Sequence, residues 1–287
     1  MGVLQNKIDF EGIIVVENAN CNGDPLNGNM PRVTYGGYGE MSDVCIKRKI
    51  RNRLLDAGEN IFVQSDDKNT DGYKSLKARA EANEAFGAEL KKGKKADAQR
   101  GYEIACKEWM DVRSFGQVFA FKGSDLSLGI RGPVSVQPAF SVDPIDITSM
   151  QITKSVNGSK DSGKDSDTMG MKHFVRYGLY KVKGSINPQL AEKTGFSEED
   201  AELIKECLRT LFVNDASAAR PDGSMEVVKL YWFKHNCKNG QYSAAKVHGS
   251  VSAELKEGVD YPKSIDDYKI NYNHSLDDLE IEEIAGL

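Results

Sequence analysis

The chain has 287 residues, of which 39% are hydrophobic and 28% charged, and its formal net charge is −5. This composition is typical of a globular protein with one large domain or two small ones. No apolar run approaches the roughly 20 residues that a membrane span needs, and the N-terminus shows no charged leader before an apolar segment. Five cysteines never form a C-x-x-C pair, which argues against a disulfide framework and a zinc site. We therefore expect a cytoplasmic protein with no membrane partner.

The first part of the chain predicts a buried strand, a loop and an amphipathic helix. Residues 8–18 form an apolar, β-branched run bounded by turn residues, as in a buried strand. A loop rich in Asn, Gly and Pro follows, and then Ser42 or Asp43 can cap a helix over about 43–56 that Gly58 ends. The apolar stripe of this helix recurs every four residues, at Ile46, Ile50 and Leu54.

The middle of the chain predicts a helical insertion followed by strands. From about 72 to 112 the composition shifts to Ala, Glu and Lys, which predicts two helices separated near a K-K-G-K-K stretch. Strand patterns return at 113–121 and 131–140, with a connection suited to a hairpin or a longer loop. Residues 155–167 are too poor in apolar side chains to pack and predict a mobile loop, after which a long strand is expected at 172–183.

The last part of the chain predicts a second helix and a further strand. Ser197 begins a capping box, S-E-E-D, ahead of an apolar-periodic helix, and residues 225–235 have the composition of a strand. The acidic stretch at 276–284 is expected to be a solvated helix or tail. Without insertions the order is strand, helix, strand, strand, helix, strand. This order predicts an α+β fold with a ferredoxin-like or RNA-recognition-motif core, whose open sheet leaves one face available for binding.

Five cations fall within seven residues of the first predicted helix: Lys47, Arg48, Lys49, Arg51 and Arg53. Residues 44–55 contain no Asp or Glu, whereas a solvated helix usually interleaves acids for i,i+4 pairing. The cluster therefore favours an anionic partner, with a solvated helix face as the alternative. The preceding loop lacks the lysine and the hydroxyl of a nucleotide-binding P-loop, since Asn29 and Met30 stand in their places. Its glycines still let the backbone approach phosphates beside a helix N-terminus.

A group of phenylalanines partly resembles an aromatic RNA-binding motif. Phe115, Phe119 and Phe121 share one face of their predicted strand, with Arg113 at its start. Stacking on bases requires these rings to be exposed, and the departures of the stretch from the motif favour a place in the core instead.

The long strand predicted near 172–183 interleaves cations with aromatic residues and valines. The cationic face and the flexible tract before it suggest a flap that grips a ligand, and a half-exposed amphipathic strand is the alternative. The candidate contacts to a nucleic acid in this region are Met169, Lys172, His173 and Arg176. Met150 and Ile152, next to the flexible tract, could be wedge residues or ordinary core.

Catalytic motifs are few. The four histidines of the chain have no companion spacing, and no hydrolase or metalloprotease motif is present. Asp24 in the loop and Asp43 at the helix start could act as acid or base near a bound phosphate, although such aspartates more often cap turns and helices. The sequence therefore predicts neither a metal site nor a cofactor.

Taken together, the first strand, the N-C-N-G-D-P-L-N-G-N-M-P-R loop and the K-R-K-I-R-N helix resemble the CRISPR-associated backbone subunit of type I-C Cascade, in the repeat-associated RNA-binding superfamily. Three further stretches resemble the same family: D-V-R-S-F-G-Q-V at 111–118, R-G-P-V-S-V at 131–136 and T-M-G-M-K-H-F-V-R-Y-G-L-Y at 168–180. The resemblance implies a non-enzymatic, hand-shaped subunit that polymerises along CRISPR guide RNA and presents it to target DNA. The expected partners are the guide RNA, the target strand, other copies of the chain, other Cascade subunits and a recruited nuclease-helicase.

The resemblance also assigns regions and residues. The palm would comprise 1–56, 113–140 and 172–250, the fingers 57–112, the thumb 141–171, and an acidic C-terminal segment 251–287. Palm contacts to RNA phosphates would come from Asn20, Asn22, Gly23, Arg32, Lys47, Arg48 and Arg51, with Lys49 and Arg53 as further candidates. Met150 and Ile152 would form a thumb wedge against a displaced nucleotide. Related RNA-targeting effectors cut with a loop aspartate, so a metal-dependent ribonuclease using Asp24 is the alternative function.

Overall fold

The structure, a computed structural model, describes residues 2–153 and 169–287. Its central element is the strand β1 (Ile8–Ala19), whose first nine residues are all buried because the sheet is covered on both faces. β1 pairs antiparallel with β10 (Met169–Ile186) on one side and with β11 (Met225–Lys234) on the other. The strands predicted at 8–18 and 225–235 are thereby confirmed.

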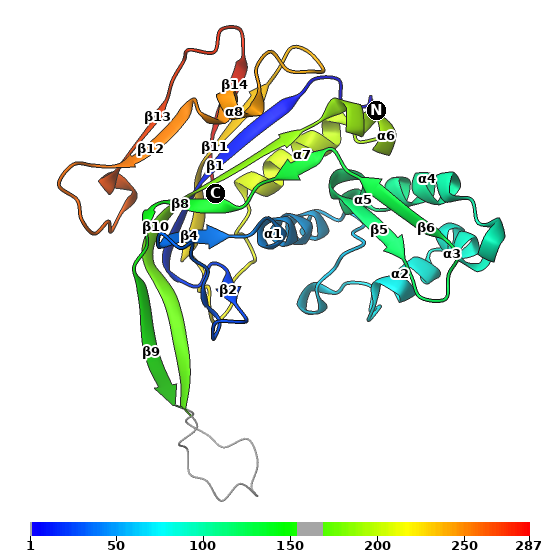
Figure 1. Cartoon of the computed structure of the whole chain (residues 1–287), viewed down its shortest axis with the longest axis horizontal. Coiled ribbons are helices and arrows are strands. Elements are labelled where there is room, and N and C mark those ends of the chain that lie inside the picture. The colour runs from blue at the N-terminus through cyan, green and yellow to red at the C-terminus, as the bar shows by residue number, and fades with distance from the viewer. Residues whose placement is uncertain (1, 154–168) are drawn as a thin grey trace, which may run out of the picture.

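These strands belong to an eight-stranded sheet in which β14, β11, β1, β10, β8 and β4 lie in that order (Figure 1). Its outer strands are β14 (Glu280–Ala285), β8 (Ala139–Pro144) and β4 (Tyr38–Met41). Two more strands, β7 (Val134–Val136) and β9 (Ile147–Thr153), pair with opposite ends of β10. The single strand predicted at 131–140 is therefore divided between β7 and β8.

The prediction of a solvated helix or tail at the acidic C-terminus is wrong. This stretch forms the edge strand β14, which pairs with β11 along six residues. Ile281 and Ile284 are half-buried on opposite faces of the sheet, while the glutamates between and before them reach the solvent at its edge. Backbone pairing with β11 and these two apolar contacts outweigh the low strand preference of glutamate.

Helices α1 (Asp43–Asp56) and α7 (Glu198–Arg209) pack together on one face of the sheet. Ser42 caps α1 by accepting a hydrogen bond from Cys45 N at 3.3 Å, and the apolar stripe Ile46, Ile50 and Leu54 is fully buried, as predicted. Ser197 and Asp200 form the predicted capping box of α7, which follows the short helix α6 (Pro188–Thr194). The predicted order of strands and helices is confirmed.

The opposite face of the sheet is not open. A C-terminal layer made of α8 (Ala244–His248), β12 (Val251–Leu255) and β13 (Tyr268–Tyr272) covers it. Tyr231 and Phe233 of β11 are 1% and 0% exposed, and they belong to one apolar cluster with Val251 and Tyr268. The expectation of an open sheet face available for binding is therefore wrong where this layer lies, because the aromatic side chains of the sheet are core residues there.

A buried charge cluster lies where β1 meets the segment that follows β11. The Asp9 carboxylate accepts a hydrogen bond from His235 Nε2 at 2.9 Å and pairs with Lys7, while His235 Nδ1 accepts from Gln241 N at 2.9 Å. Burial alone raises the pKa of Asp9, but the hydrogen bonds from His235 and Lys7 outweigh it and lower this pKa below its usual value.

Asp9→Asn should destabilise the protein in a pH-dependent way. Because the folded pKa is lowered, the ionised Asp9 stabilises the fold above the unfolded pKa of about 3.9, and this contribution is lost as pH falls through the folded pKa. At neutral pH we expect the free energy of unfolding to fall by about 3 kcal/mol, because the partners of the buried carboxylate lose its charge. Urea unfolding at neutral and acidic pH measures both effects, and equal stability of mutant and wild type at neutral pH would contradict them.

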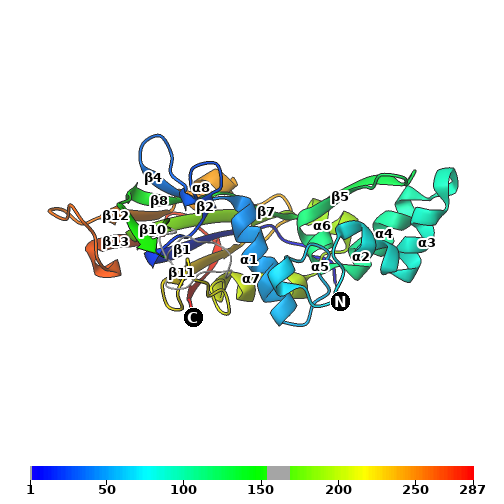
Figure 2. The same cartoon turned by 90° about the horizontal axis from the view of Figure 1, so that it is seen from below.

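An insertion forms a lobe at one end of the molecule (Figures 1 and 2). It contains the helices α2 (Leu76–Ala82), α3 (Glu84–Lys91), α4 (Ala98–Glu108) and α5 (Met110–Phe115), and the hairpin of β5 (Gly116–Ala120) and β6 (Ser127–Arg131). The lobe has a core of its own, in which the Phe119 ring lies 4.9 Å from both Phe62 and Phe86 and 6.1 Å from Trp109, measured between ring centroids.

The insertion corrects two sequence predictions. It holds four helices in place of two, although the K-K-G-K-K stretch does separate α3 from α4 as predicted. The strand predicted to begin at Arg113 begins only at Gly116, because α5 continues to Phe115. Gly116 ends that helix with φ +82°, and a Cβ at this position would lie 2.2 Å from the Ile130 carbonyl oxygen, so only glycine fits this turn.

β9 and the first residues of β10 form a two-stranded ribbon that projects from the body of the molecule (Figure 1). In the described part of the chain, residues 169–174 of β10 pair with β9 alone. The tract predicted to be a mobile loop, 155–167, lies outside the described residues. Within residues 2–153 and 169–287, none of the helices has the length and apolar character that a membrane crossing requires.

Candidate nucleic-acid interface

The loop between β1 and α1 has a defined backbone conformation. It contains the short paired strands β2 (Gly23–Asp24) and β3 (Met30–Pro31), and Gly28 and Asn29 adopt left-handed conformations at φ +57° and +59°. A Cβ on Gly23 would lie 2.0 Å from Asn29 Oδ1, so a larger residue at this position would displace the Asn29 side chain. The Gly/Asn/Pro composition therefore serves a defined turn whose backbone can lie close to a partner.

The first two asparagines of the loop, Asn20 and Asn22, hydrogen-bond within the protein. Asn20 is 4% exposed and donates from Nδ2 to the Asn29 carbonyl oxygen at 2.7 Å. Asn22 Oδ1 accepts hydrogen bonds from the backbone N and the hydroxyl of Ser42, both at 2.9 Å. The structure thus places Asn20 and Asn22 as residues that shape the loop and join it to the N-terminus of α1.

Asp24 and Arg32 lie at the mouth of the same turn. Asp24 Oδ1 accepts from Leu26 N at 3.1 Å and lies 3.6 Å from Arg32 Nη2. Arg32 is 36% exposed in its side chain, and its Nε is a buried donor without a hydrogen-bond partner among the described residues. The Arg32 guanidinium therefore retains hydrogen-bonding capacity, whereas Asp24 has the geometry of a turn-capping residue.

Each of the five cations of α1 meets a carboxylate. The pairs are Lys47–Asp43 at 3.0 Å, Arg48–Asp67 at 3.4 Å, Arg51–Asp111 at 2.9 Å, Arg53–Asp56 at 2.8 Å, and Lys49–Asp215. The absence of acids within 44–55 therefore does not leave the helix unpaired, because its partners come from the helix ends and from distant segments. This corrects the inference that the cluster as a whole presents free positive charge.

Burial separates these five cations into two groups. The side chains of Lys49 and Arg51 are 4% and 14% exposed, and each lies over an aromatic ring, 5.3 Å from the Phe212 centroid and 5.1 Å from the Phe115 centroid. Arg53 is held from two sides by Asp56 and by Thr210, whose hydroxyl lies 3.1 Å from Arg53 Nε. These three cations therefore help to hold the fold together, and their contact with RNA stays a prediction.

Lys47 and Arg48 form the accessible group. Their side chains are 24% and 50% exposed, and the carboxylates that they meet, Asp43 and Asp67, are themselves 36% and 73% exposed. Such exposed pairs contribute only about 0 to 1 kcal/mol, so a phosphate can replace either carboxylate. Of the five predicted helix contacts, these two remain free to act on a partner.

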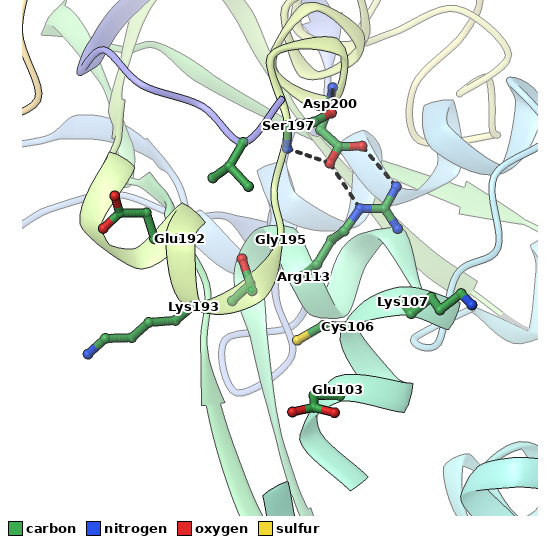
Figure 3. Close-up of a pocket in the computed structure, with 11 residues that line it drawn as sticks. Glu103, Cys106, Lys107, Arg113, Glu192, Lys193, Gly195, Ser197 and Asp200 are labelled. Atoms are coloured by element: carbon green, nitrogen blue, oxygen red, sulfur yellow. Dashed lines mark hydrogen bonds and ion pairs between the residues drawn. The ribbon is translucent and has the colours of Figure 1, made fainter. Parts of the chain in front are cut away.

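Arg113 joins the insertion to the body. Its Nε and Nη2 donate to the two oxygens of Asp200 at 3.0 and 2.8 Å, and Asp200 also accepts from Ser197 N at 2.9 Å (Figure 3). This pair lines a cavity of about 530 Å³ together with Cys106, whose thiol pKa burial raises to about 12. Arg113 therefore helps to hold the insertion against the body, and its contact with RNA stays a prediction. The raised pKa disfavours the thiolate form of Cys106.

The proposed aromatic motif does not form. Phe115 lies on helix α5 beneath Arg51, whereas Phe119 lies on β5, so the two rings do not share a strand face. Phe119 is fully buried in the core of the insertion, which confirms the prediction that these phenylalanines are core residues. Phe115 is half-buried against the main core, and its contact with RNA stays a prediction.

The ribbon brings the remaining predicted residues onto an exposed surface. Met150 and Ile152 of β9 are 47% and 49% exposed, and Met169 of β10 is 64% exposed. Met150 lies opposite Lys172 and Ile152 lies opposite Gly170, so these side chains share one face of the ribbon. Met169 lies on the other face with His173, whose Nδ1 is 2.7 Å from Ser149 Oγ.

Sequence reasoning missed a groove at the base of the ribbon. It measures about 650 Å³ and is lined by Arg176, Tyr177, Tyr261 and Lys263, among others. Tyr261 is 76% exposed, and it comes from the loop between β12 and β13, far from Arg176 in sequence. The Gly-Val-Asp-Tyr-Pro sequence of this loop has no pattern that indicates a place beside β10. Only the folded chain therefore shows that Tyr261 and Arg176 line one groove.

Comparisons with known proteins place this geometry in a family context. Residues 6–273 match the sequence model of a family described as "CRISPR-associated protein Cas7". A curated relative from Haloferax volcanii with the same description is 26% identical over 229 residues, which are 72% of this chain. The match spans 64% of the relative's own length.

Solved structures show a similar fold. A chain of a "CRISPR RNA-guided surveillance complex, pre-nicking" superposes with a TM-score of 0.53 at 17% identity, covering 89% of this chain and 84% of that one. A chain of a "CRISPR RNA-guided surveillance complex" gives a TM-score of 0.45 at 18% identity, over 79% of this chain and 68% of that one, which is too low to support an argument. The first likeness shows that the mixed α+β fold with its large antiparallel sheet is shared.

Proposed function

This chain belongs to the CRISPR-associated Cas7 family, and on that premise we propose that it is the backbone subunit of an RNA-guided surveillance complex. In this proposal copies of the chain polymerise along a CRISPR guide RNA, hold its phosphate backbone and present its bases to a target DNA strand. The assignment to a type I-C Cascade, acting with other Cascade subunits and a recruited nuclease-helicase in the cytoplasm, rests on the motif resemblance and belongs to the same proposal.

The projecting ribbon is the single observation that carries this proposal. Two strands alone are marginal in water, and this ribbon exposes Met150, Ile152, Met169 and Met171 beyond the body of the protein. Lys172 lies on the same face as Met150, so the ribbon offers apolar contact for bases and a positive charge for phosphates. A strand of RNA has both chemistries at regular intervals.

The loop and α1 would supply the second side of the RNA site. Lys47, Arg48 and Arg32 are the accessible cations there, and the glycine-containing turn would let backbone N–H groups lie close to phosphates. Because each copy supplies few contacts, tight binding has to come from repetition along one strand.

The regions of the hand follow from the same proposal. The sheet with α1 and α7 would be the palm, the insertion the fingers, and the segment 141–171 the thumb. The hairpin of β5 and β6 shares the core of the insertion, so we move the end of the fingers from 112 to about 131. The C-terminal segment 251–287 is part of the body, since β12 and β13 pack on the sheet and β14 is its edge strand.

The proposal contains no catalytic step by this chain. Asp24 is the residue on which the alternative, a metal-dependent ribonuclease, depends, and its carboxylate is engaged with Leu26 N and Arg32. In the described residues, no group of three or more His, Cys, Asp or Glu side chains is arranged to hold a metal ion. No observation favours the ribonuclease, and we do not propose it.

Met150→Ser combined with Ile152→Ser tests the role of the ribbon. Each side chain is about half-exposed and would lose about 1 kcal/mol of apolar burial against RNA, so the affinity for a long RNA should fall about 30-fold. Filter binding at fixed salt measures this change. Val118→Ser is the matched control, because Val118 is 68% exposed on β5 of the insertion. Equal affinities of the ribbon variant and the control would remove the ribbon from the RNA site.

A further inference from the structure

Three asparagines in the described part of the chain are followed directly by glycine, at Asn22–Gly23, Asn27–Gly28 and Asn239–Gly240. A fourth pair, Asn157–Gly158, lies outside the described residues. Asparagine is among the thermally labile residues, because the backbone nitrogen of the next residue can attack its side-chain amide. Glycine has no side chain to shield that nitrogen, so an Asn–Gly pair is the sequence at which this reaction is easiest.

The pair Asn27–Gly28 is exposed and free of hydrogen bonds at the reacting groups. It lies in the turn between β2 and β3, which projects from the body (Figure 1). The Asp24 carbonyl oxygen accepts from Asn27 N at 3.1 Å and from Asn29 N at 2.8 Å, so the turn is held on either side of Gly28. Among the described residues, neither the Asn27 side-chain amide nor the Gly28 N–H has a hydrogen-bond partner.

The space around Gly28 is also open. A Cβ at Gly28 would meet no atom within 4 Å, and both Asn27 and Gly28 are exposed to solvent. The Asn27 side chain can therefore turn toward Gly28 N without displacing a neighbour and without breaking a hydrogen bond within the protein.

The pair Asn22–Gly23 is held in a different state. Asn22 is half-buried, and its Oδ1 accepts from the backbone N and the hydroxyl of Ser42, both at 2.9 Å. Gly23 is crowded, since a Cβ there would lie 2.0 Å from Asn29 Oδ1. Attack on the Asn22 amide would break both hydrogen bonds to Ser42, so the fold protects this pair.

The pair Asn239–Gly240 is protected although Asn239 is exposed. Asn239 Oδ1 accepts from Gln189 Nε2 at 2.6 Å, and Gly240 N donates to the Cys237 carbonyl oxygen at 3.3 Å. Both reacting groups are therefore engaged. Hydrogen bonding, rather than exposure alone, distinguishes Asn27 from the other two asparagines.

We propose that Asn27 is a site of spontaneous deamidation in the folded protein, and that this modification weakens the binding of RNA. Gly28 N forms a bond to Asn27 Cγ while the Cγ–Nδ2 bond breaks. The proton of the Gly28 N–H passes through the solvent to Nδ2, which leaves as ammonia. One water molecule then opens the cyclic imide to aspartate or to isoaspartate. The reaction consumes one water, releases one ammonia and needs no oxidant or reductant.

The effect on RNA rests on the proposed function, whereas the deamidation itself does not. Either product places a new carboxylate in the turn that contains Asp24 and lies beside Arg32. A carboxylate about 4 Å from a phosphate in water would lower the affinity of one copy about 5-fold. Isoaspartate also adds one carbon to the main chain between β2 and β3, where Met30 N donates to the Asn27 carbonyl oxygen at 3.0 Å. The loss at each copy multiplies along a strand.

The site is tested by incubating the purified full chain in mildly alkaline buffer made with heavy-oxygen water, which marks newly formed carboxylates. Fragment-ion mass spectrometry locates each converted asparagine. We expect Asn27 to convert at least about 10-fold faster than Asn22 and Asn239, because these two must first break hydrogen bonds. The same chain unfolded in urea is the matched control, in which the three pairs should convert at similar rates. Similar rates in the folded protein would overturn the proposal.

Asn27→Gln separates the effect of this modification from general ageing of the protein, because the longer side chain must close a larger and slower-forming ring. Filter binding measures the affinity for a long RNA before and after incubation. The wild type should lose affinity at least about 5-fold once Asn27 is converted, and the variant should keep its affinity. Equal losses in both proteins, or unchanged affinity of the converted wild type, would overturn the proposal. Fresh wild type that binds no RNA would contradict the proposed function while leaving the deamidation site in place.

Discussion

Lys47→Glu combined with Arg48→Glu is expected to abolish assembly on RNA while the protein stays folded. These are the accessible cations of α1, and the exposed carboxylates that they meet, Asp43 and Asp67, hold them only weakly. Reversal places two further acids beside those aspartates and repels the phosphates that the wild type would hold. If each cation contacts one phosphate of a single strand, the log–log salt slope per copy should become shallower by about 1.4.

The effect on assembly exceeds the effect on one copy, because a loss at every subunit multiplies along the strand. The RNA content of the purified protein and its gel-shift pattern on a long RNA measure this loss, and circular dichroism measures the fold. Lys256→Glu with Lys269→Glu is the matched control, since both lysines are exposed on or beside the β12–β13 hairpin. Retention of normal RNA content by the α1 variant would contradict the role given to this helix.

Asp111→Ala is expected to give the largest loss of stability. The Asp111 side chain is fully buried and accepts from Arg51 Nε at 2.9 Å, from Phe62 N at 2.7 Å and from Val63 N at 3.1 Å. Its removal leaves a nearly buried guanidinium unpaired and two backbone donors unsatisfied, which costs about 3 to 5 kcal/mol. Much of a typical domain's stability of about 5 to 15 kcal/mol would then be lost.

Thermal or urea unfolding measures this loss, and Asp67→Ala serves as the matched control. Asp67 is also the carboxylate partner of an α1 cation, Arg48, but both side chains are at least half exposed. Its removal should change the free energy of unfolding by less than about 1 kcal/mol. Similar effects of the two substitutions would contradict the division of α1 into buried and accessible cations.

Local patterns of the sequence predict the body well. The four-residue spacing of Ile46, Ile50 and Leu54, the cap at Ser42 and the capping box at Ser197 each concern neighbours in sequence. Their energies are set within one or two turns, so they can be recognised before the tertiary structure is known.

Predictions failed where the decisive partner is distant in sequence. Asp111 and Asp215, which neutralise Arg51 and Lys49, lie 60 and 166 residues away from them. The layer that covers Tyr231 is likewise built from β12 and β13, and β14 exists because β11 offers an edge to pair with. The residue pattern within a segment does not reveal these distant partners.

The candidate site shows the same division. The glycines of the β2–β3 turn lie in the loop that the sequence predicts, whereas no sequence pattern predicted the strand β9 that exposes Met150 and Ile152. The free positive charge of a surface is harder to predict, because the sequence does not show whether a basic residue will form an ion pair with a carboxylate. The K-R-K-I-R-N-R run is the most basic stretch of the chain, yet its cations are all paired, while the shorter K-K-G-K-K stretch keeps most of its charge exposed.

The central claim is that copies of this chain repeat along one guide RNA. Native mass spectrometry of the protein expressed together with a guide RNA tests it most directly, because one spectrum reports both RNA content and the number of copies. We predict a single RNA molecule with several copies of the chain, and a copy number that rises in whole steps as the guide is lengthened. A monomer without RNA, or a copy number independent of guide length, would contradict the account.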